Sequence, residues 1–185
     1  MKSYEAFLKE VLIDEATLQK RVTELGAEIS SDYAHENSLL LVCILKGGVM
    51  FLTDLMRHIS VPHEIDFLAV SSYGRGARAS SGNVRIDMDL RDLVQNKHIL
   101  IVEDIIDSGH TLRFVMDVLA ARQPASIRLC TLLDKPSRRT IDIPISYTGF
   151  QIEDKFVFGY GLDLDEKYRN LPFIGVVDLD KLNAG

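Results

Sequence analysis

The stretch ILIVEDIIDSGHTL, from Ile99 to Leu112, decides the fold that this chain is expected to adopt. It begins as an apolar run, places carboxylates at Glu103, Asp104 and Asp107, and then passes through a Ser-Gly-His-Thr turn into a helical pattern. A strand that is apolar on both faces and leads into a helix is typical of a parallel sheet covered on both sides. Ligands bind beyond the carboxyl ends of such strands, so these acids lie at the expected edge of a site.

The rest of the chain continues this alternation of strands and helices. Apolar runs bounded by glycine, proline or polar clusters predict strands at 38–48, 63–73, 97–107 and 125–136. Apolar residues at helical spacing predict helices at 49–59 and 111–123. Shorter strands and turns are expected after residue 136.

The composition is that of one globular domain. A chain of 185 residues, 46% of them hydrophobic, is long enough to build a complete core. No apolar run is long enough to span a bilayer, which argues against a membrane protein. The stretch 1–18 lacks the apolar centre of a signal peptide, so a cytoplasmic location is expected. We predict an amphipathic helix there, with one apolar face formed by Phe7, Leu8, Val11 and Leu12.

Charge and cysteine content argue against several kinds of site. Cys43 and Cys130 lie inside apolar runs and are expected to be buried, reduced thiols, because no spacing typical of a zinc site is present. The net charge of −6 argues against wide, non-specific nucleic-acid binding. It is compatible with a polyanionic small ligand, since a bound divalent metal can reverse the local field.

The turn after the acidic strand end offers a cradle for phosphate. The backbone N–H groups of a helix start are unpaired, and the helix dipole there favours an anion. Ser108 and Thr111 add hydroxyl donors, and Gly109 lets the backbone come close to a ligand. The simpler alternative is that Ser108 or Thr111 caps the helix and the acids are solvated. Neighbouring carboxylates repel one another, however, and have little structural use without a cation.

The motifs resemble those of a known family. The stretch from Ile99 to Leu112 resembles the phosphoribosyl-pyrophosphate signature of the type I phosphoribosyltransferases. LKGG at 45–48 resembles their pyrophosphate loop, and SSY at 71–73 the start of their mobile lid. LLDKP at 132–136 and DKFVFGYGLDLDEKYRNLP at 154–172 resemble the base-binding half of the hypoxanthine (hypoxanthine-guanine) branch. The resemblance covers almost the entire chain, in order.

The resemblance implies an α/β fold with a central, mostly parallel sheet, helices on both faces, and a small hood built largely from the C-terminal segment. One domain would span 1–185, with its core at about 30–135 and the hood at about 136–185 together with the N-terminal segment. A lid would cover about 71–85, beginning with Ser72 and Tyr73. The family also forms homodimers and homotetramers, so either is expected, and no nucleic-acid or membrane partner is.

The resemblance implies a purine-salvage reaction that needs Mg²⁺. A 6-oxopurine, hypoxanthine and also guanine, would attack C1′ of phosphoribosyl pyrophosphate through its N9 atom. Magnesium pyrophosphate would leave, and IMP or GMP would form. The preference between the two bases is not readable from side chains, because backbone groups read the 2-position of the purine.

The phosphoribosyl group would be bound by the residues that follow the apolar part of the signature, namely Glu103, Asp104, Ile105, Ile106, Asp107, Ser108, Gly109, His110 and Thr111. The ring of His110 has no assigned role. Asp107 matches the general acid/base proposed in the family for N7 of the purine. Glu103 and Asp104 match the ligands of the ribose hydroxyls, partly through magnesium. Adjacent strand residues point in opposite directions, so these two are not expected to grip one ion symmetrically.

The other ligand groups also have matching residues. Lys46, the Gly47 backbone and Arg169 match the pyrophosphate site, and Asp163 matches a ligand of a second magnesium. In the family, the peptide bond between Lys46 and Gly47 can be cis.

The purine would contact three residues of the C-terminal half. Lys135 matches the lysine that donates to the 6-oxo group, Phe156 the aromatic ring that stacks on the base, and Val157 the residue whose backbone pairs with the purine edge. For a single phenylalanine, the simpler alternative is an ordinary core residue.

Two other functions are less well supported. A phosphoribosyl-pyrophosphate-sensing, nucleic-acid-binding regulator of the same fold would need an added DNA-binding domain or a basic face, and the acidic balance argues against it. A phosphohydrolase would favour two aspartates spaced two residues apart, whereas Glu103 and Asp104 are adjacent.

Overall fold

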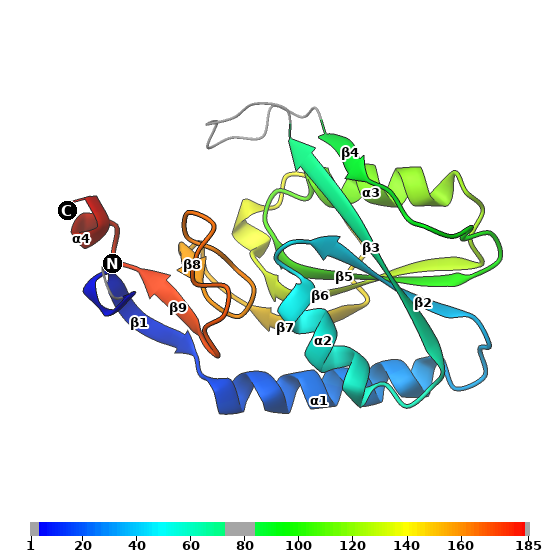
Figure 1. The fold of residues 1–185 in the computed structure, drawn as a ribbon, viewed down its shortest axis with the longest axis horizontal. Helices are drawn as coiled ribbons and strands as arrows, with labels where there is room; N and C mark the ends of the chain where they lie inside the picture. Colours follow the sequence, from blue (N-terminus) through cyan, green and yellow to red (C-terminus); the bar gives the residue numbers. More distant parts are fainter. Residues whose placement is uncertain (1–3, 73–83, 184–185) are drawn as a thin grey trace.

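The computed structural model describes residues 4–72 and 84–183 of the chain, and Figure 1 shows their arrangement. The larger of two sheets consists, in spatial order, of β4 (Val84–Met88), β3 (His63–Ser72), β2 (Leu39–Leu45), β5 (His98–Ile106), β6 (Ser126–Asp134) and β7 (Tyr147–Gln151). Neighbouring strands of this sheet are parallel except for β3 and β4, which are antiparallel. The predicted fold class, with its mostly parallel central sheet, is confirmed.

The two strands at the centre of the sheet determine where a site can form. Six of the seven residues of β2 are buried, as is the run from Ile99 to Val102 in β5. The parallel register pairs Leu39 with His98 and continues to Cys43 with Val102, so both strands end at the same edge. The polar residues that follow them therefore meet there. Cys43 and Cys130 are buried free thiols, as predicted.

Helices cover both faces of this sheet. The helices α1 (Glu15–Asp32) and α2 (Val49–His58) pack on one face, where Leu25 and Phe51 join Cys43 in one core cluster. The helix α3 (His110–Ala120) packs on the other face, where Val115 joins Ile101 in a second cluster. The short elements are η1 (Tyr4–Ala6), η2 (Pro136–Arg138) and α4 (Leu179–Asn183). No helix among the described residues is long and apolar enough to cross a membrane.

The helix predicted for residues 1–18 is wrong. Leu8–Ile13 form the strand β1, and the helix begins only at Glu15. Asp14 explains the boundary, because its Oδ1 accepts a hydrogen bond from the Thr17 N–H at 2.7 Å and caps α1. The strand is stabilised by antiparallel pairing with β9 (Ile174–Val177), near the opposite end of the chain, which no local pattern could reveal.

The smaller sheet brings the two ends of the chain together. Its spatial order is β1, β9 and β8 (Val157–Phe158), and its core is formed by Phe7, Phe158, Leu164 and Val177. The rings of Phe7 and Phe158 lie 5.4 Å apart. The segment after β8 reaches the larger sheet, because a Cβ at Gly161 would lie only 2.1 Å from the carbonyl oxygen of Gly47. The smaller sheet thus places a C-terminal loop over the end of β2.

Gly26 sets the distance between α1 and α2, and this generates a prediction. A Cβ at Gly26 would lie 2.4 Å from Cβ of His58 and 2.7 Å from its carbonyl oxygen. We expect Gly26→Ala to lower the free energy of unfolding by about 1–2 kcal/mol, because overpacking outweighs the gain in helix propensity. Denaturant unfolding measures this. The exposed neighbour provides the control: Ala27→Ser should stay within about 0.5 kcal/mol. Equal stability of both variants would contradict the close contact.

Candidate active site

The candidate site lies where β2, β5 and β6 end side by side. β2 is followed by the turn Lys46–Gly48, β5 by the loop Asp107–Gly109, and β6 by Lys135. The pairing of Ile106 with Asp134 brings the ends of β5 and β6 to one edge. This is the edge at which parallel α/β sheets bind ligands.

A cavity of about 230 Å³ opens at the loop between β5 and α3. Gly109 is the N-cap of α3, with φ of 93°, and no side chain of the described residues caps the helix. The alternative in which Ser108 or Thr111 serves as the cap is therefore wrong, and the first N–H groups of α3 are available to an anion. The residues that line the cavity are Glu103, Ile105, Ile106, Asp107, Ser108, Gly109, Thr111 and Leu112.

Two of the residues predicted to bind phosphoribose, Asp104 and His110, do not line this cavity. Asp104 lies against the turn after β2, since a Cβ at Gly47 would lie 1.6 Å from its Oδ2. The ring of His110 contacts Thr140, with 3.2 Å between Nε2 and Oγ1. Glu103 and Asp104 thus point to different sides, as the alternation along a strand predicts.

The acids at the end of β5 lie in a strongly perturbed environment. Burial raises the pKa of Asp104 to about 6. Burial, and then repulsion from Asp104, raise the pKa of Glu103 well above its usual range. Oε2 of Glu103 is buried without a hydrogen-bond partner among the described residues. Such carboxylates are stabilised by a cation or by hydroxyl donors.

The acids do not form a ready-made metal cage. Within residues 4–72 and 84–183, no group of three His, Cys, Asp or Glu side chains is arranged to hold an ion. Mg²⁺ usually keeps several waters and binds through one or two carboxylates and a substrate phosphate. The unpartnered oxygen of Glu103 and the buried Asp104 suit that kind of site.

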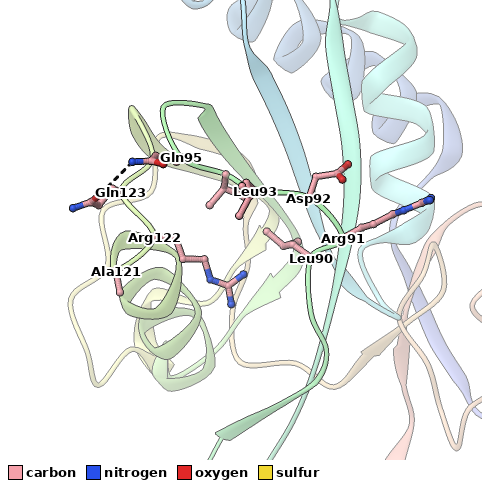
Figure 2. Close-up of a pocket in the computed structure, with 9 residues that line it drawn as sticks. Leu90, Arg91, Asp92, Leu93, Gln95, Ala121, Arg122 and Gln123 are labelled. Carbon is pink, nitrogen blue, oxygen red and sulfur yellow. Dashed lines mark hydrogen bonds between the residues drawn. The ribbon is translucent and has the colours of Figure 1, made fainter.

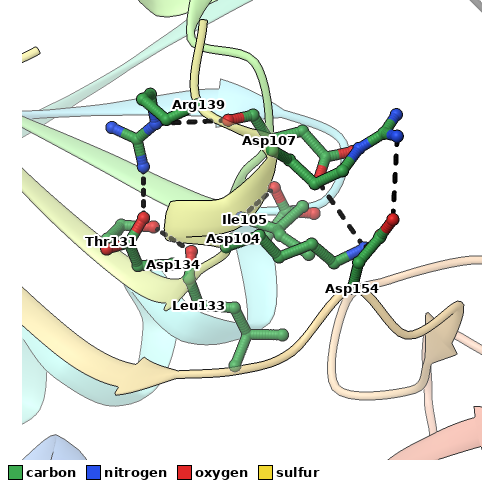
Figure 3. Close-up of polar contacts among 10 residues, drawn as sticks. Asp104, Ile105, Asp107, Thr131, Leu133, Asp134, Arg139 and Asp154 are labelled. Atoms are coloured by element: carbon green, nitrogen blue, oxygen red, sulfur yellow. Dashed lines mark hydrogen bonds and ion pairs between the residues drawn. The ribbon is translucent and has the colours of Figure 1, made fainter. Parts of the chain in front are cut away.

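A segment after β6 supports the loop that leads into α3. The N–H groups of Thr140 and Ile141 donate to the Ser108 carbonyl oxygen at 3.1 and 3.2 Å. Nε of Arg139 donates to the Asp107 carbonyl oxygen at 3.2 Å, and its guanidinium also pairs with the buried Asp134 (Figure 3). These supporting residues were not predicted from the sequence. An acid at the end of the apolar run of β6 was the available signal, because a buried carboxylate needs a partner.

The residues expected to bind pyrophosphate lie together in an ion cluster. Nη2 of Arg169 lies 2.9 Å from Oδ1 of Asp163 and 3.3 Å from Oε2 of Glu166. Nζ of Lys46 lies 2.9 Å from the same Glu166 oxygen. Glu166 was not predicted. The expected cis bond between Lys46 and Gly47 is also wrong in position, because the cis peptide joins Leu45 to Lys46, where β2 ends.

Lys135 lies between the carboxylates of Asp107 and Asp154, on the other side of the site. Lys135 is only 6% exposed. Its Nζ is 3.5 Å from Oδ1 of Asp107 and 3.4 Å from Oδ1 of Asp154. The other oxygen of Asp154, Oδ2, lies 3.6 Å from Nη1 of Arg138. Asp154 is a further residue that the sequence did not single out. The buried ammonium is thus held beside Asp107, the acid that follows β5.

The remaining predicted residues flank this arrangement. Phe156 is 49% exposed, so the alternative of an ordinary core aromatic is wrong, whereas Val157 is buried in β8. Ser72 ends β3 and pairs with Val84 of β4. Tyr73 and the rest of the expected lid up to residue 83 lie outside the described residues.

A second hollow, of about 470 Å³, lies away from these strand ends (Figure 2). It is lined by residues 90–95, which precede β5, and by residues 121–123, which follow α3. It is therefore at the opposite end of β5 from Glu103. One of the lining residues, Leu93, is 86% exposed. Another, Arg122, forms an ion pair with Asp89 at 2.8 Å. The smaller cavity remains the better candidate because the perturbed acids and the open helix start lie there.

The site combines an anion-binding helix start, buried acids and cations on two facing loops, which suits a phosphorylated ligand. A family profile described as "Phosphoribosyl transferase domain" matches residues 12–167. That match defines the class: the chain is a phosphoribosyltransferase, as the resemblance predicted. It is 48% identical over 171 residues to the hypoxanthine phosphoribosyltransferase of Salmonella typhimurium, covering 92% of this chain and 96% of that one. The chain belongs to the hypoxanthine phosphoribosyltransferases, a family of purine-salvage transferases.

Solved structures agree with this assignment. A hypoxanthine phosphoribosyltransferase from Staphylococcus aureus superposes with a TM-score of 0.91 at 45% identity, covering 97% of both chains. A hypoxanthine-guanine phosphoribosyltransferase from Bacillus anthracis superposes with a TM-score of 0.86 at 44% identity, covering 92% of this chain and 99% of that one. The predicted fold and enzyme class are confirmed.

The Asp134–Arg139 pair generates a prediction about stability. Arg139→Met leaves the Asp134 carboxylate, which is 5% exposed, without its cation. Breaking a buried ion pair in this way should lower the free energy of unfolding by about 3–5 kcal/mol. Denaturant unfolding measures the change. The double variant Asp134→Asn/Arg139→Met should recover much of the loss, because no buried charge is left unpaired.

Arg138 offers a matched control for this prediction. It is adjacent in sequence, and its side chain is 52% exposed beside an equally exposed Asp154. Arg138→Met should therefore change the free energy of unfolding by less than about 1 kcal/mol. If Arg138→Met and Arg139→Met lower the free energy of unfolding equally, the buried Asp134–Arg139 pair does not stabilise the segment after β6.

Proposed function

We propose that this enzyme transfers the phosphoribosyl group of phosphoribosyl pyrophosphate to hypoxanthine, and also to guanine, forming IMP or GMP and pyrophosphate. The observation that carries the proposal is the Lys135 ammonium, 6% exposed and 3.5 Å from Asp107. A buried group that can only donate hydrogen bonds would select a base with an acceptor at position 6. The names of the relatives from Salmonella and Bacillus support the same choice of bases.

The 5′-phosphate would bind in the cavity at the start of α3. The backbone N–H groups of Ser108, Gly109 and His110, with the hydroxyls of Ser108 and Thr111, would donate to its oxygens. Gly109 allows the close approach, because a side chain at its φ of 93° would be strained and would meet Ile143 at 2.8 Å. The unpartnered Oε2 of Glu103 would accept from a ribose hydroxyl, and Asp104 would face the ribose from the other side.

The leaving pyrophosphate would bind at the turn after β2. Lys46, the Gly47 backbone and Arg169 would supply positive charge and N–H donors. Mg²⁺ would neutralise the charge of the pyrophosphate. Glu103 and Asp104 would contribute to holding one ion, partly through its waters, and Asp163 would be a ligand of a second ion. Raised pKa values at Glu103 and Asp104 support this, because a cation would restore the charged forms.

The purine would be held between Lys135 and the smaller sheet. Lys135 would donate to the 6-oxo group, and Asp107 would hold the N7 proton during attack by N9. The half-exposed ring of Phe156 would stack on the base, and the Val157 backbone would pair with its edge. The smaller sheet, with the loop that follows β8, would act as the hood that carries these contacts.

We also propose that the enzyme works in the cytoplasm as a homodimer or homotetramer. The free thiols of Cys43 and Cys130 are in keeping with a reducing compartment. Light scattering after size-exclusion chromatography measures the oligomeric state directly.

The choice of base provides the main test of the proposed function. Adenine presents an amino donor at position 6, so two donors would face each other at Lys135, and adenine should be rejected by about 10⁴–10⁵-fold in kcat/KM. Pyrophosphate release with hypoxanthine, guanine, xanthine and adenine, in Mg²⁺ and in excess chelator, measures this. Lys135→Ala should weaken hypoxanthine and guanine use together. Efficient use of adenine, or full activity in chelator, would refute the proposal.

Asp107 provides a second test. If it holds the N7 proton, Asp107→Asn should lower kcat by about 10²–10⁴-fold, with little change in phosphoribosyl pyrophosphate binding. Asp154→Asn is the matched control, because it removes the other carboxylate beside Lys135, at 3.4 Å, and should affect kcat much less. Equal losses in both variants would assign the effect to the charge of Lys135 instead of proton transfer.

A further inference from the structure

Glu166 lies between the two cations of the pyrophosphate turn. Its Oε2 is 2.9 Å from Nζ of Lys46 and 3.3 Å from Nη2 of Arg169. Lys46 follows β2, and Arg169 belongs to the loop after β8, so one carboxylate oxygen joins two separate segments. Hydrogen bonds from Lys46 and Arg169 lower the pKa of Glu166, so the group is ionised at neutral pH.

The backbone of Glu166 adopts a left-handed conformation that glutamate rarely takes. Asp165 and Glu166 have φ of 52° and 62°, and they form the tip of a hairpin closed by hydrogen bonds between Leu164 and Lys167 at 3.1 Å in both directions. Glycine, asparagine or aspartate is favoured at such positions, and glutamate is not. The Glu166 N–H also donates to Oδ2 of Asp163 at 2.9 Å, which fixes the tip. An unfavourable residue that is held this firmly points to a use for its side chain.

Folding stability does not explain the arrangement. The side chains of Lys46 and Glu166 are 68% and 66% exposed, and exposed ion pairs contribute little to stability. Their contact matters instead for where the charges lie. A carboxylate oxygen shared by a lysine and an arginine occupies the position that a phosphate oxygen would take between the same two groups.

We propose that Glu166 is a positioning residue that takes the place of pyrophosphate between Lys46 and Arg169 and is displaced when pyrophosphate binds. This inference rests on the pyrophosphate role proposed above for the two cations. Pyrophosphate must break the contacts of Glu166 to form its own, so the carboxylate weakens pyrophosphate binding. As pyrophosphate begins to leave, Glu166 takes over its contacts with the two cations, and this competition speeds release.

Removing the charge of Glu166 tests this directly. Glu166→Gln keeps the size of the side chain, and we expect magnesium pyrophosphate to bind about 3–10-fold more tightly and to dissociate more slowly, because the competing anion is gone. Calorimetry and product inhibition measure the affinity. The KM for hypoxanthine should not change, since Lys135 and Phe156 are untouched. Glu166→Gly is the second variant, because glycine suits the left-handed tip and keeps the hairpin.

Asp165 supplies the matched control. It carries the same charge at the same hairpin tip, but it makes no contact with Lys46 or Arg169. Asp165→Asn should therefore leave pyrophosphate affinity within about twofold, because exposed charges beyond contact are screened by salt. A gain as large as that of Glu166→Gln would assign the effect to net charge and overturn the proposal.

The remaining outcomes distinguish the proposed role of Glu166 from the proposed pyrophosphate site. If the parent enzyme binds magnesium pyrophosphate and neither Glu166 variant binds it more tightly, the role of Glu166 is refuted. Weaker binding in both variants also refutes it, because Glu166 would then only brace the two segments. If the parent enzyme does not bind magnesium pyrophosphate, or if Lys46→Ala binds it equally well, the proposed pyrophosphate site itself fails.

Discussion

Three segments of the chain meet at Gly47, and the candidate site depends on that contact. A Cβ there would lie 1.6 Å from the Asp104 carboxylate, and a Cβ at Gly161 would lie 2.1 Å from the Gly47 carbonyl oxygen. The turn after β2, the end of β5 and the loop after β8 therefore come together only where side chains are missing. This close packing brings Lys46, Asp104 and the loop that carries Arg169 within reach of one ligand. A larger residue at either glycine would separate the cations from the acids.

The charges of the site are mostly paired within the chain. Lys135 is held by Asp107 and Asp154, and Arg139 by the buried Asp134. Glu103 is different, because one of its oxygens is buried without a partner in the described ranges. A substrate would therefore exchange existing contacts for its own, and a hydroxyl group or a metal ion would gain most at the unpartnered oxygen of Glu103. The ion pairs within the chain explain how a site with so many charged groups can be stable without a ligand.

The smaller sheet is tied to the core by a polar contact at Asp54. The Tyr160 hydroxyl donates to Oδ2 of Asp54 at 2.7 Å, and Nε2 of Gln19 donates to the same oxygen at 2.8 Å. Burial and the Asp54 hydrogen bond raise the pKa of Tyr160, so it remains a donor at any physiological pH. The loop after β8 thereby has a fixed position relative to α2. Residues from both ends of the chain can then form one site.

Local sequence patterns determined the alternation of strands and helices, the acidic end of β5 and the open helix start, because each depends on neighbouring residues. The family motifs also singled out Lys46, Asp163 and Arg169, which the structure brings together. Only the tertiary structure decided that Leu8–Ile13 form a strand, that Arg139 pairs with Asp134, and that Glu166 bridges two cations. The physical reason is the same in each case: the partner lies on another segment, and neither strand pairing nor ion pairing with a distant segment leaves a periodic pattern in the chain.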